Sequence, residues 1–305
     1  MTGGVVLRLV RDDDDLDEIN AGCSTWFGGA PVRALMSVKD GAPKEMWVAE
    51  VDGVAAGFGQ AVGHGVSDGR RGIGYVFVRP EFRRRGLGTL LWNAVLEVAG
   101  PDRVPGVMAQ TDDADTTTLE IAVDHGFTLR ALHIESVLDL GRVGELRHLA
   151  TAPRAPGVEL RPLPEDADER TWRTFADTFN RLMRTAPDYA DGAEDMPFET
   201  MRAVLEEPWQ VYGAWVDGRM VGLTCVVVRD RDTGVLNTML TAVEVDRRGL
   251  GLATALKTAH ALALNEAGWS SLVTQNMEGN VAILAANRTL GFVRTLGKRD
   301  LAFDY

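Results

Sequence analysis

Apolar and polar residues follow the same succession of patterns twice along the chain. Alternation with a period of two is typical of strands that bury one face, and a Val-Asp-Gly turn between two such runs indicates a hairpin. In the first half the two strands are Met46–Val51 and Val54–Val62. In the second half they are Val211–Val216 and Met220–Val228. We therefore predict one β-hairpin in each half.

Similar elements surround both hairpins. Each half opens with a short apolar strand and an acidic cluster that is typical of a helix start, and later adds a strand and a helix that ends at glycine. These elements are the opening strands Val5–Val10 and Val158–Leu163, the later strands Gly106–Thr111 and Ser271–Asn276, and the helices Asp115–His125 and Asn280–Leu290. Hairpins followed by helical crossovers predict a mixed, mostly antiparallel sheet flanked by helices, an α/β (α+β mixed) fold.

Several landmarks recur at a constant offset of 165 residues. They are the Val-Asp-Gly turn, an Arg-x-x-Gly-x-Gly/Ala loop, a polar pair at the end of a strand, and a Gly-Phe pair. Agreement in register without a gap indicates an internal repeat. We therefore predict two copies of one domain, at 1–140 and 158–305, joined by a linker at 141–157.

Composition and charge narrow the functional classes. The chain has 305 residues, of which 45% are hydrophobic and 25% charged, as expected for a globular protein with a buried core. Its net charge of −12 argues against nucleic acid as a partner. The N-terminal residues show no basic region followed by an apolar stretch, so we expect no signal peptide, and no run approaches 18 apolar residues, so we expect no membrane span. The two cysteines, Cys23 and Cys225, have no metal-ligand spacing, so we expect a reduced, cytoplasmic protein without a metal.

The chemistry is predicted at the stretch Thr241–Lys257 and its counterpart in the first copy. Small residues at the start of a helix let several backbone N–H groups point outward, where the helix dipole adds positive potential. This arrangement is typical of a pyrophosphate site. A Gly-rich turn that only permits tight packing is an alternative. A dinucleotide-binding loop is disfavoured, because the spacing is not Gly-x-Gly-x-x-Gly.

The motifs Arg83-x-x-Gly86-x-Gly88 and Arg248-x-x-Gly251-x-Ala253 resemble the signature of the GNAT superfamily of acyl-CoA N-acyltransferases. The later block that ends in Gly291-Phe292 resembles the second conserved block of that family. With both copies, the chain resembles tandem-domain GNAT N-acetyltransferases.

The resemblance implies acetyl-CoA or another acyl-CoA as co-substrate and no metal. It implies cofactor-binding residues in the second copy at Val243, Glu244, Val245, Arg248, Gly249, Leu250, Gly251, Leu252, Ala253, Thr254, Asn276 and Asn280. In the first copy it implies Val78, Arg79, Pro80, Arg83, Arg84, Arg85, Gly86, Leu87, Gly88 and Thr89.

The resemblance also implies direct attack of an amine on the thioester. The backbone N–H near Val243 would stabilise the oxyanion. The position of the family's acid, a tyrosine four residues before Gly-Phe, is Asn287 here and Ala122 in the first copy. Asparagine donates a hydrogen bond but is no acid. The usual place of the base is Asn237, so Glu244 is a nearby candidate among the carboxylates.

The second copy has the better polar set and is predicted to be the catalytic one. Thr241, Gln275, Asp188 and Tyr189 are the candidate substrate-binding residues, and the acidic loop around Asp188 favours a cationic amine. We predict transfer of acetyl from acetyl-CoA to a primary amine of a small molecule, by a monomer or homodimer. Two alternatives stay open: a non-catalytic acyl-CoA-binding or sensor protein, and CoA-linked chemistry other than amine acylation.

Overall fold

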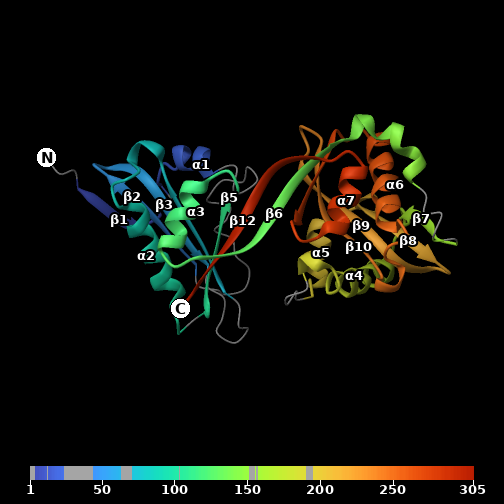
Figure 1. The fold of residues 1–305 in the computed structure, drawn as a ribbon, viewed down its shortest axis with the longest axis horizontal. Helices are drawn as coiled ribbons and strands as arrows, with labels where there is room; N and C mark the ends of the chain where they lie inside the picture. Colours follow the sequence, from blue (N-terminus) through green and yellow to red (C-terminus); the bar gives the residue numbers. More distant parts are fainter. Residues whose placement is uncertain are drawn as a thin grey trace. The chain divides into compact units, whose positions relative to one another are not determined.

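The computed structural model describes residues 4–11, 13–23, 44–62, 71–102, 104–150, 155, 157–189 and 195–305. The chain divides into two compact units (Figure 1). One consists of Met1–Ala131 with Lys298–Tyr305, and the other of Leu132–Gly297. Each unit contains a mixed sheet with helices on its faces, which confirms the predicted fold class. None of the described helices is long and apolar enough to cross a membrane.

The first unit contains the sheet order β1-β2-β3-β4-β5, in which only β4 and β5 are parallel. Its strands are β1 (Val5–Leu9), β2 (Lys44–Val51), β3 (Val54–Val62), β4 (Gly72–Val78) and β5 (Gly106–Asp112). Its helices are α1 (Asp17–Cys23), η3 (Pro80–Phe82), α2 (Leu87–Ala99) and α3 (Thr116–Asp124). Because side chains alternate along β2, Trp47 and Ala49 pack against α2, while Met46 and Val48 pack against the opposite layer with Ile19 of α1.

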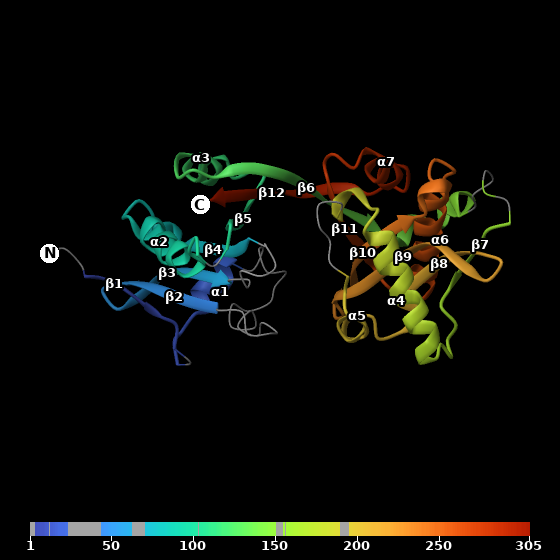
Figure 2. The ribbon, with the colours of Figure 1, turned by 90° about the horizontal axis from the view of Figure 1, so that it is seen from below.

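The second unit repeats this plan with the order β7-β8-β9-β10-β11. Its strands are β7 (Glu159–Pro162), β8 (Val211–Val216), β9 (Arg219–Asp230), β10 (Val235–Val243) and β11 (Ser271–Met277). Its helices are η4 (Leu140–Leu149), α4 (Glu169–Met183), η5 (Pro187–Tyr189), α5 (Phe198–Val204), η6 (Pro208–Gln210), η7 (Val245–Arg247), α6 (Leu252–Glu266) and α7 (Val281–Thr289). Helices α4 and α5 cover one face of this sheet, and α6 and α7 cover the other (Figures 1 and 2).

The helices of the second unit hold the later site in place. Helix α4 begins at Asp168, whose side chain accepts a hydrogen bond from Thr171 N at 2.8 Å. Its apolar residues recur at helical spacing, so Phe175 and Phe179 are buried against the sheet together with Leu240 of β10. On the other face, Leu256 of α6 is buried with Val243. Strand β10 is thus packed from both sides.

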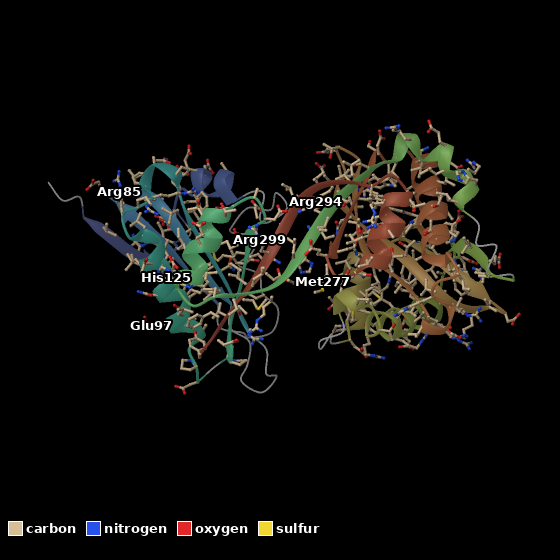
Figure 3. All side chains as sticks on the ribbon, viewed as in Figure 1. Arg85, Glu97, His125, Met277, Arg294 and Arg299 are labelled. Atoms are coloured by element: carbon tan, nitrogen blue, oxygen red, sulfur yellow. The ribbon has the colours of Figure 1, made fainter. Side chains whose placement is uncertain are left out.

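The sheet of each unit is completed by a strand from the other half of the sequence. Strand β6 (Thr128–Asp139) starts in the first unit, and its residues His133–Asp139 pair antiparallel with β11. Met277, labelled in Figure 3, is the partner of His133. Strand β12 (Val293–Asp304) starts in the second unit, and its residues Lys298–Asp304 pair with β5.

The two units therefore do not follow the sequence order of the predicted domains, 1–140 and 158–305. Residues 132–140 belong to the second unit and 298–305 to the first. In the predicted linker at 141–157, residues up to Leu149 form the 3-10 helix η4. Its residues Leu140 and Val143 are buried in the core with α6, so this stretch is a packed part of the second unit.

Candidate active site

Strands β10 and β11 separate after a short parallel contact. They pair only over Val235–Asn237 and Ser271–Val273, and a bulge follows in β10 between Thr238 and Leu240. From Thr238 to Val243 the strand keeps β9 as its partner, which leaves an edge about 17 Å long at about 3.3 Å per residue. Such an edge can bind an extended ligand like an added strand.

The hydrogen-bond pattern shows which backbone groups face this gap. Glu244 N donates to Val221 O of β9 at 2.9 Å. Since backbone groups of successive strand residues point to alternate sides, the N–H groups of Val243 and Thr241 point away from β9 and toward the gap. Val243 therefore has the orientation that the sequence predicted for an oxyanion-binding amide.

A pocket of about 310 Å³ fills the gap. It lies between β10, β11, the start of α6, helix α7 and η5. Among the predicted site residues, those that line it are Asp188, Thr241, Val243, Arg248, Gly249, Gly251, Ala253, Thr254, Gln275, Asn276 and Asn280. The structure thus brings together residues from η5 to α7 that lie far apart in the sequence.

The loop before α6 presents open backbone amides to the pocket. Gly249 and Gly251 have φ angles of 75° and 80°, values that favour glycine, and no side chain caps the first turn of α6. A Cβ atom at either glycine would meet nothing within 4 Å, so close packing does not explain them. The arrangement fits an anion at the helix N-terminus.

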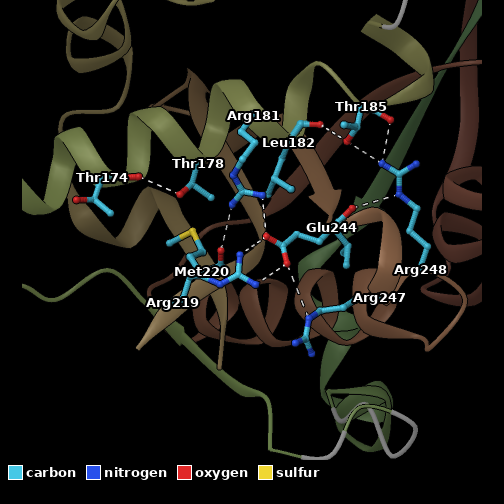
Figure 4. A network of polar contacts seen from close by, with 11 residues as sticks. Thr174, Thr178, Arg181, Leu182, Thr185, Arg219, Met220, Glu244, Arg247 and Arg248 are labelled. Carbon is cyan, nitrogen blue, oxygen red and sulfur yellow. Dashed lines mark hydrogen bonds and ion pairs between the residues drawn. The ribbon is translucent and has the colours of Figure 1, made fainter. Parts of the chain in front are cut away.

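The arginine of the motif has a different role from the loop amides. Arg248 Nε donates to Val243 O at 3.2 Å, and its Nη2 donates to Thr185 O at 2.9 Å (Figure 4). Arg83 makes the corresponding bond to Val78 O at 3.0 Å in the first copy. The guanidinium therefore fastens the loop to the preceding strand in both copies.

Arg247 is the cation that sequence reasoning missed here. It lines the pocket, and its buried Nε has no hydrogen-bond partner among the described residues. The same Nε forms an ion pair with Glu244 at 3.9 Å.

Glu244, the candidate base, does not line this pocket. It accepts hydrogen bonds from Arg181 Nη1 at 2.7 Å and Arg219 Nη2 at 2.9 Å (Figure 4). Burial alone would raise the pKa of this carboxyl group, but the hydrogen bonds from Arg219 and Arg181 outweigh it and leave the pKa below its ordinary value. A carboxylate held in this way is a poor proton acceptor.

A chain of side-chain amides leads from α7 to η5. Asn287 Nδ2 donates to Asn276 Oδ1 at 2.9 Å, and Asn276 Nδ2 donates to Asp188 Oδ2 at 3.1 Å. Asn280 Nδ2 donates to the other oxygen of Asp188 at 3.0 Å. Asn287 is only 3% exposed and lies behind the pocket wall, so it orients Asn276 instead of contacting a ligand. Asp188 is held as a fixed negative group at the pocket.

The other predicted residues of the second copy are placed as follows. Thr241 exchanges a 2.9 Å hydrogen bond with Thr224, and Gln275 donates to Glu135 of β6 at 2.9 Å. Leu252 is buried in the core, whereas Val245 and Leu250 do not line the pocket. The side chain of Tyr189 lies outside the described residues.

The first copy repeats the loop geometry with different side chains. Gly86 has a φ of 80°, and the first turn of α2 is also uncapped by side chains. Arg84 adopts a left-handed φ of 63° at the position of Gly249. Arg79 is bound to Glu81 at 2.6 Å. Arg85, labelled in Figure 3, lies over the Phe82 ring at 5.4 Å.

Lys257 is the second residue that sequence reasoning missed. It lies on α6 one turn after Thr254, is 2% exposed and lines the pocket. Its Nζ has no hydrogen-bond partner among the described residues. The signal in the sequence was a lysine inside an otherwise apolar helix, on the same face as Thr254.

Splayed parallel strands beside an open helix N-terminus are the arrangement that the resemblance to acyl-CoA-dependent transferases led us to expect. The family model described as the acetyltransferase (GNAT) family matches residues 14–127, within the first copy. The chain is 29% identical to a mycothiol acetyltransferase of Thermomonospora curvata over 276 residues, which are 88% of this chain and 85% of that protein. It is 26% identical to a mycothiol acetyltransferase of Geodermatophilus obscurus, over 94% of this chain and 95% of that protein.

Solved structures share the fold over nearly the whole chain. A tandem GNAT protein from the clavulanic acid biosynthesis pathway superposes with a TM-score of 0.72 at 20% identity, over 99% of this chain and 98% of that one. A GCN5-related N-acetyltransferase from Sphaerobacter thermophilus gives 0.71 at 18% identity, over 98% and 95%. These matches confirm the predicted resemblance of the chain to tandem-domain GNAT N-acetyltransferases.

Proposed function

We propose that the second copy transfers an acetyl group from acetyl-CoA to a primary amine of a small molecule. The observation that carries this proposal is the pocket of about 310 Å³, which runs from the open amides of α6 along the unpaired edge of β10. The pyrophosphate would bind the amides from Gly249 to Thr254, with Arg247 beside it. The pantetheine arm would lie along the open edge of β10 beside Thr241–Val243, with the thioester carbonyl oxygen within reach of the N–H of Val243.

Buried polar atoms without partners support a ligand of this kind. The Oγ1 of Thr238, the Nε of Arg247 and the Nζ of Lys257 all belong to pocket-lining residues and have no hydrogen-bond partner among the described residues. Leaving such groups unsatisfied is costly. A bound CoA ester supplies phosphate, amide and thioester acceptors for them. The first copy keeps the loop geometry, and we propose it as a second, weaker acyl-CoA site.

The acceptor is proposed to be a small cationic amine. Asp188 lies at the pocket, and two asparagine amides fix both of its oxygens. A fixed carboxylate attracts an ammonium group and places its nitrogen near the thioester. Two relatives are named as mycothiol acetyltransferases, which favours a small-molecule acceptor over a protein.

Direct transfer requires few groups of the protein. The bound ammonium group first gives one proton to water. The neutral amine then attacks the thioester carbonyl carbon, and the N–H of Val243 stabilises the oxyanion that forms. The proton of the amine passes to water at the mouth of the pocket, since Glu244 is directed to its arginines. Positioning and oxyanion stabilisation thus provide most of the rate enhancement.

Titration calorimetry of acetyl-CoA tests this proposal. A carboxylate introduced by Gly251→Asp would repel the pyrophosphate and strain the left-handed backbone, so binding should be lost. Gly86→Asp makes the matched change in the first copy and should leave the main binding isotherm intact. Absence of binding to the wild type refutes the proposal. Loss of binding with Gly86→Asp alone would assign the site to the first copy.

Two other functions are distinguished by a turnover assay. Binding of acetyl-CoA without release of free thiol in the presence of an amine panel would indicate a binding or sensor protein. Thiol release with alcohols but not amines would indicate O-acylation. We expect thiol release that depends on an amine and is lost with Gly251→Asp.

A further inference from the structure

Lys257 is an unusual residue for the place that it occupies. It lies in the second turn of α6, with 2% of its surface exposed, and its Nζ has no hydrogen-bond partner among the described residues. The ring of Phe292 lies beside it, with its centroid 4.8 Å from Nζ. Burying an ammonium group without a counter-ion is strongly unfavourable, so a structural role alone does not explain it.

The internal repeat shows that the fold does not need a lysine here. The aligned residue in the first copy is Trp92, and it packs on Phe127, the counterpart of Phe292, with ring centroids 5.1 Å apart. An apolar ring therefore fills this place in the first copy, against the same aromatic partner. The cation is specific to the copy that contains the pocket.

Lys257 also marks the inner end of the pocket along α6. The pocket begins at the loop glycines, continues past Thr254 and ends on this helix at Lys257, one turn of about 5.4 Å further on. The next residues of the same face, His260 and Ala261, do not line it. A CoA ester with its pyrophosphate at the loop would direct its pantetheine arm into the pocket, toward this inner end.

We propose that the ammonium group of Lys257 stabilises the departing thiolate of CoA and protonates it. This inference rests on the proposed function and adds the acid that the sequence did not reveal at Asn287. As the tetrahedral intermediate collapses, the C–S bond breaks and its electron pair stays on sulfur. The proton then moves from Nζ to sulfur, which gives free CoA and the amide. The neutral lysine takes up a proton from water before the next cycle.

The acidity of the two groups fits this transfer. Burial lowers the pKa of Lys257 to about 7. A free thiol has a pKa of about 8.5, so the ammonium group is the stronger acid and the transfer to a thiolate is favourable. The charged or titratable groups nearby are His260 on the same helix and Asp188, Arg247 and Arg248 at the pocket. Burial lowers the pKa of His260 to about 4, so it stays neutral near pH 7.

Binding of CoA and of desulfo-CoA, in which hydrogen replaces the thiol, tests this contact without any acceptor. We expect the wild type to bind CoA roughly tenfold more tightly than desulfo-CoA, because only CoA offers a sulfur to the ammonium group. Lys257→Met keeps a similar length without the charge and should bind both ligands equally, with the affinity for desulfo-CoA unchanged. Arg288→Met removes a cation from the exposed side of the neighbouring α7 and should preserve the preference.

Kinetics provides the second measurement. With an amine that the wild type acetylates, Lys257→Met should lower kcat roughly 100-fold and leave the KM for acetyl-CoA within about threefold, as for a lost general acid. Equal affinity of the wild type for CoA and desulfo-CoA refutes the role of Lys257 but not the proposed function. A variant that keeps the preference or the kcat refutes it too. If acetyl-CoA does not bind to the wild type, both proposals fail.

Discussion

Single residues distinguish the two copies more than their backbones do. At aligned positions the second copy has Gly249 and Lys257, where the first has Arg84 and Trp92. Both residues have a left-handed φ, but Gly249 has no side chain, whereas Arg84 has a long one. These substitutions leave the loop of the second copy open and put a charge inside its pocket. They are the reason for assigning the chemistry to that copy.

Glu244 should contribute to stability and not to proton transfer. Its carboxylate joins Arg181 and Arg219, so Glu244→Gln removes charged hydrogen bonds and should reduce the free energy of unfolding by about 2 kcal/mol at pH 7. Because the pKa of Glu244 in the fold lies below its ordinary value of 4.5, this contribution is complete above that pH. It is lost as the pH falls through the lower pKa of the folded state.

Thermal unfolding of Glu244→Gln and wild type between pH 7 and pH 3 measures this effect. The difference in melting temperature should be constant at neutral pH and shrink toward pH 3. The pH dependence of kcat at its acid limb should be the same in both proteins. An acid limb that disappears with the substitution would restore Glu244 as the base.

At the scale of elements, the start of α7 joins stability to the site. Asn280 Oδ1 accepts from Ile283 N at 3.4 Å, which caps the helix, while its Nδ2 donates to Asp188. In the first copy Asp115 caps α3 by accepting from Thr118 N at 2.9 Å. The aligned caps thus share one function, and only Asn280 has the second.

The variants Asn280→Ala and Asp115→Ala separate these two functions. Each should lower the free energy of unfolding by about 1 kcal/mol, the usual cost of a lost N-cap. Only Asn280→Ala should also raise the KM for the amine, roughly threefold to tenfold, because Asp188 loses one of its two amide donors. Chemical denaturation and steady-state kinetics of both variants check this. An unchanged KM in Asn280→Ala would remove Asp188 from the acceptor site.

Much of the site could be predicted from the sequence, because the repeat aligns loops and strands that local patterns define. The loop at Arg248–Thr254 and the polar residues Gln275 and Asn276 lie at one pocket as expected. The orientation of Glu244 could not be predicted, since it depends on arginines from α4 and β9. Nor does the sequence pattern reveal that the Nζ of Lys257 lacks a hydrogen-bond partner among the described residues, which is the feature that makes this lysine unusual.

At the scale of the whole molecule, the exchanged strands could not be predicted either. Local hydrophobic patterns indicate that β6 and β12 are strands, but each strand has the same alternation whether it pairs with its own half or with the other. Only the observed register, with β6 on β11 and β12 on β5, shows the exchange. Sequence order is therefore a poor guide to which core a residue stabilises.

A crossed pair of substitutions tests this arrangement. Leu138 of β6 is buried in the core of the second unit, and Leu301 of β12 is buried opposite Ala109 of β5 in the first. Leu138→Ala and Leu301→Ala should each lower the free energy of unfolding by about 3 kcal/mol.

In amide hydrogen exchange, Leu138→Ala should speed exchange in β8 and β9 and leave β2 and β3 protected, although residue 138 precedes the predicted linker. Leu301→Ala should do the reverse, although residue 301 is near the end of the chain. Because the pocket belongs to the second unit, acetyl-CoA at a concentration that fills only the stronger site should slow exchange in the affected peptides of Leu138→Ala and not in those of Leu301→Ala. Faster exchange of β2 and β3 in Leu138→Ala would show that the units follow sequence order.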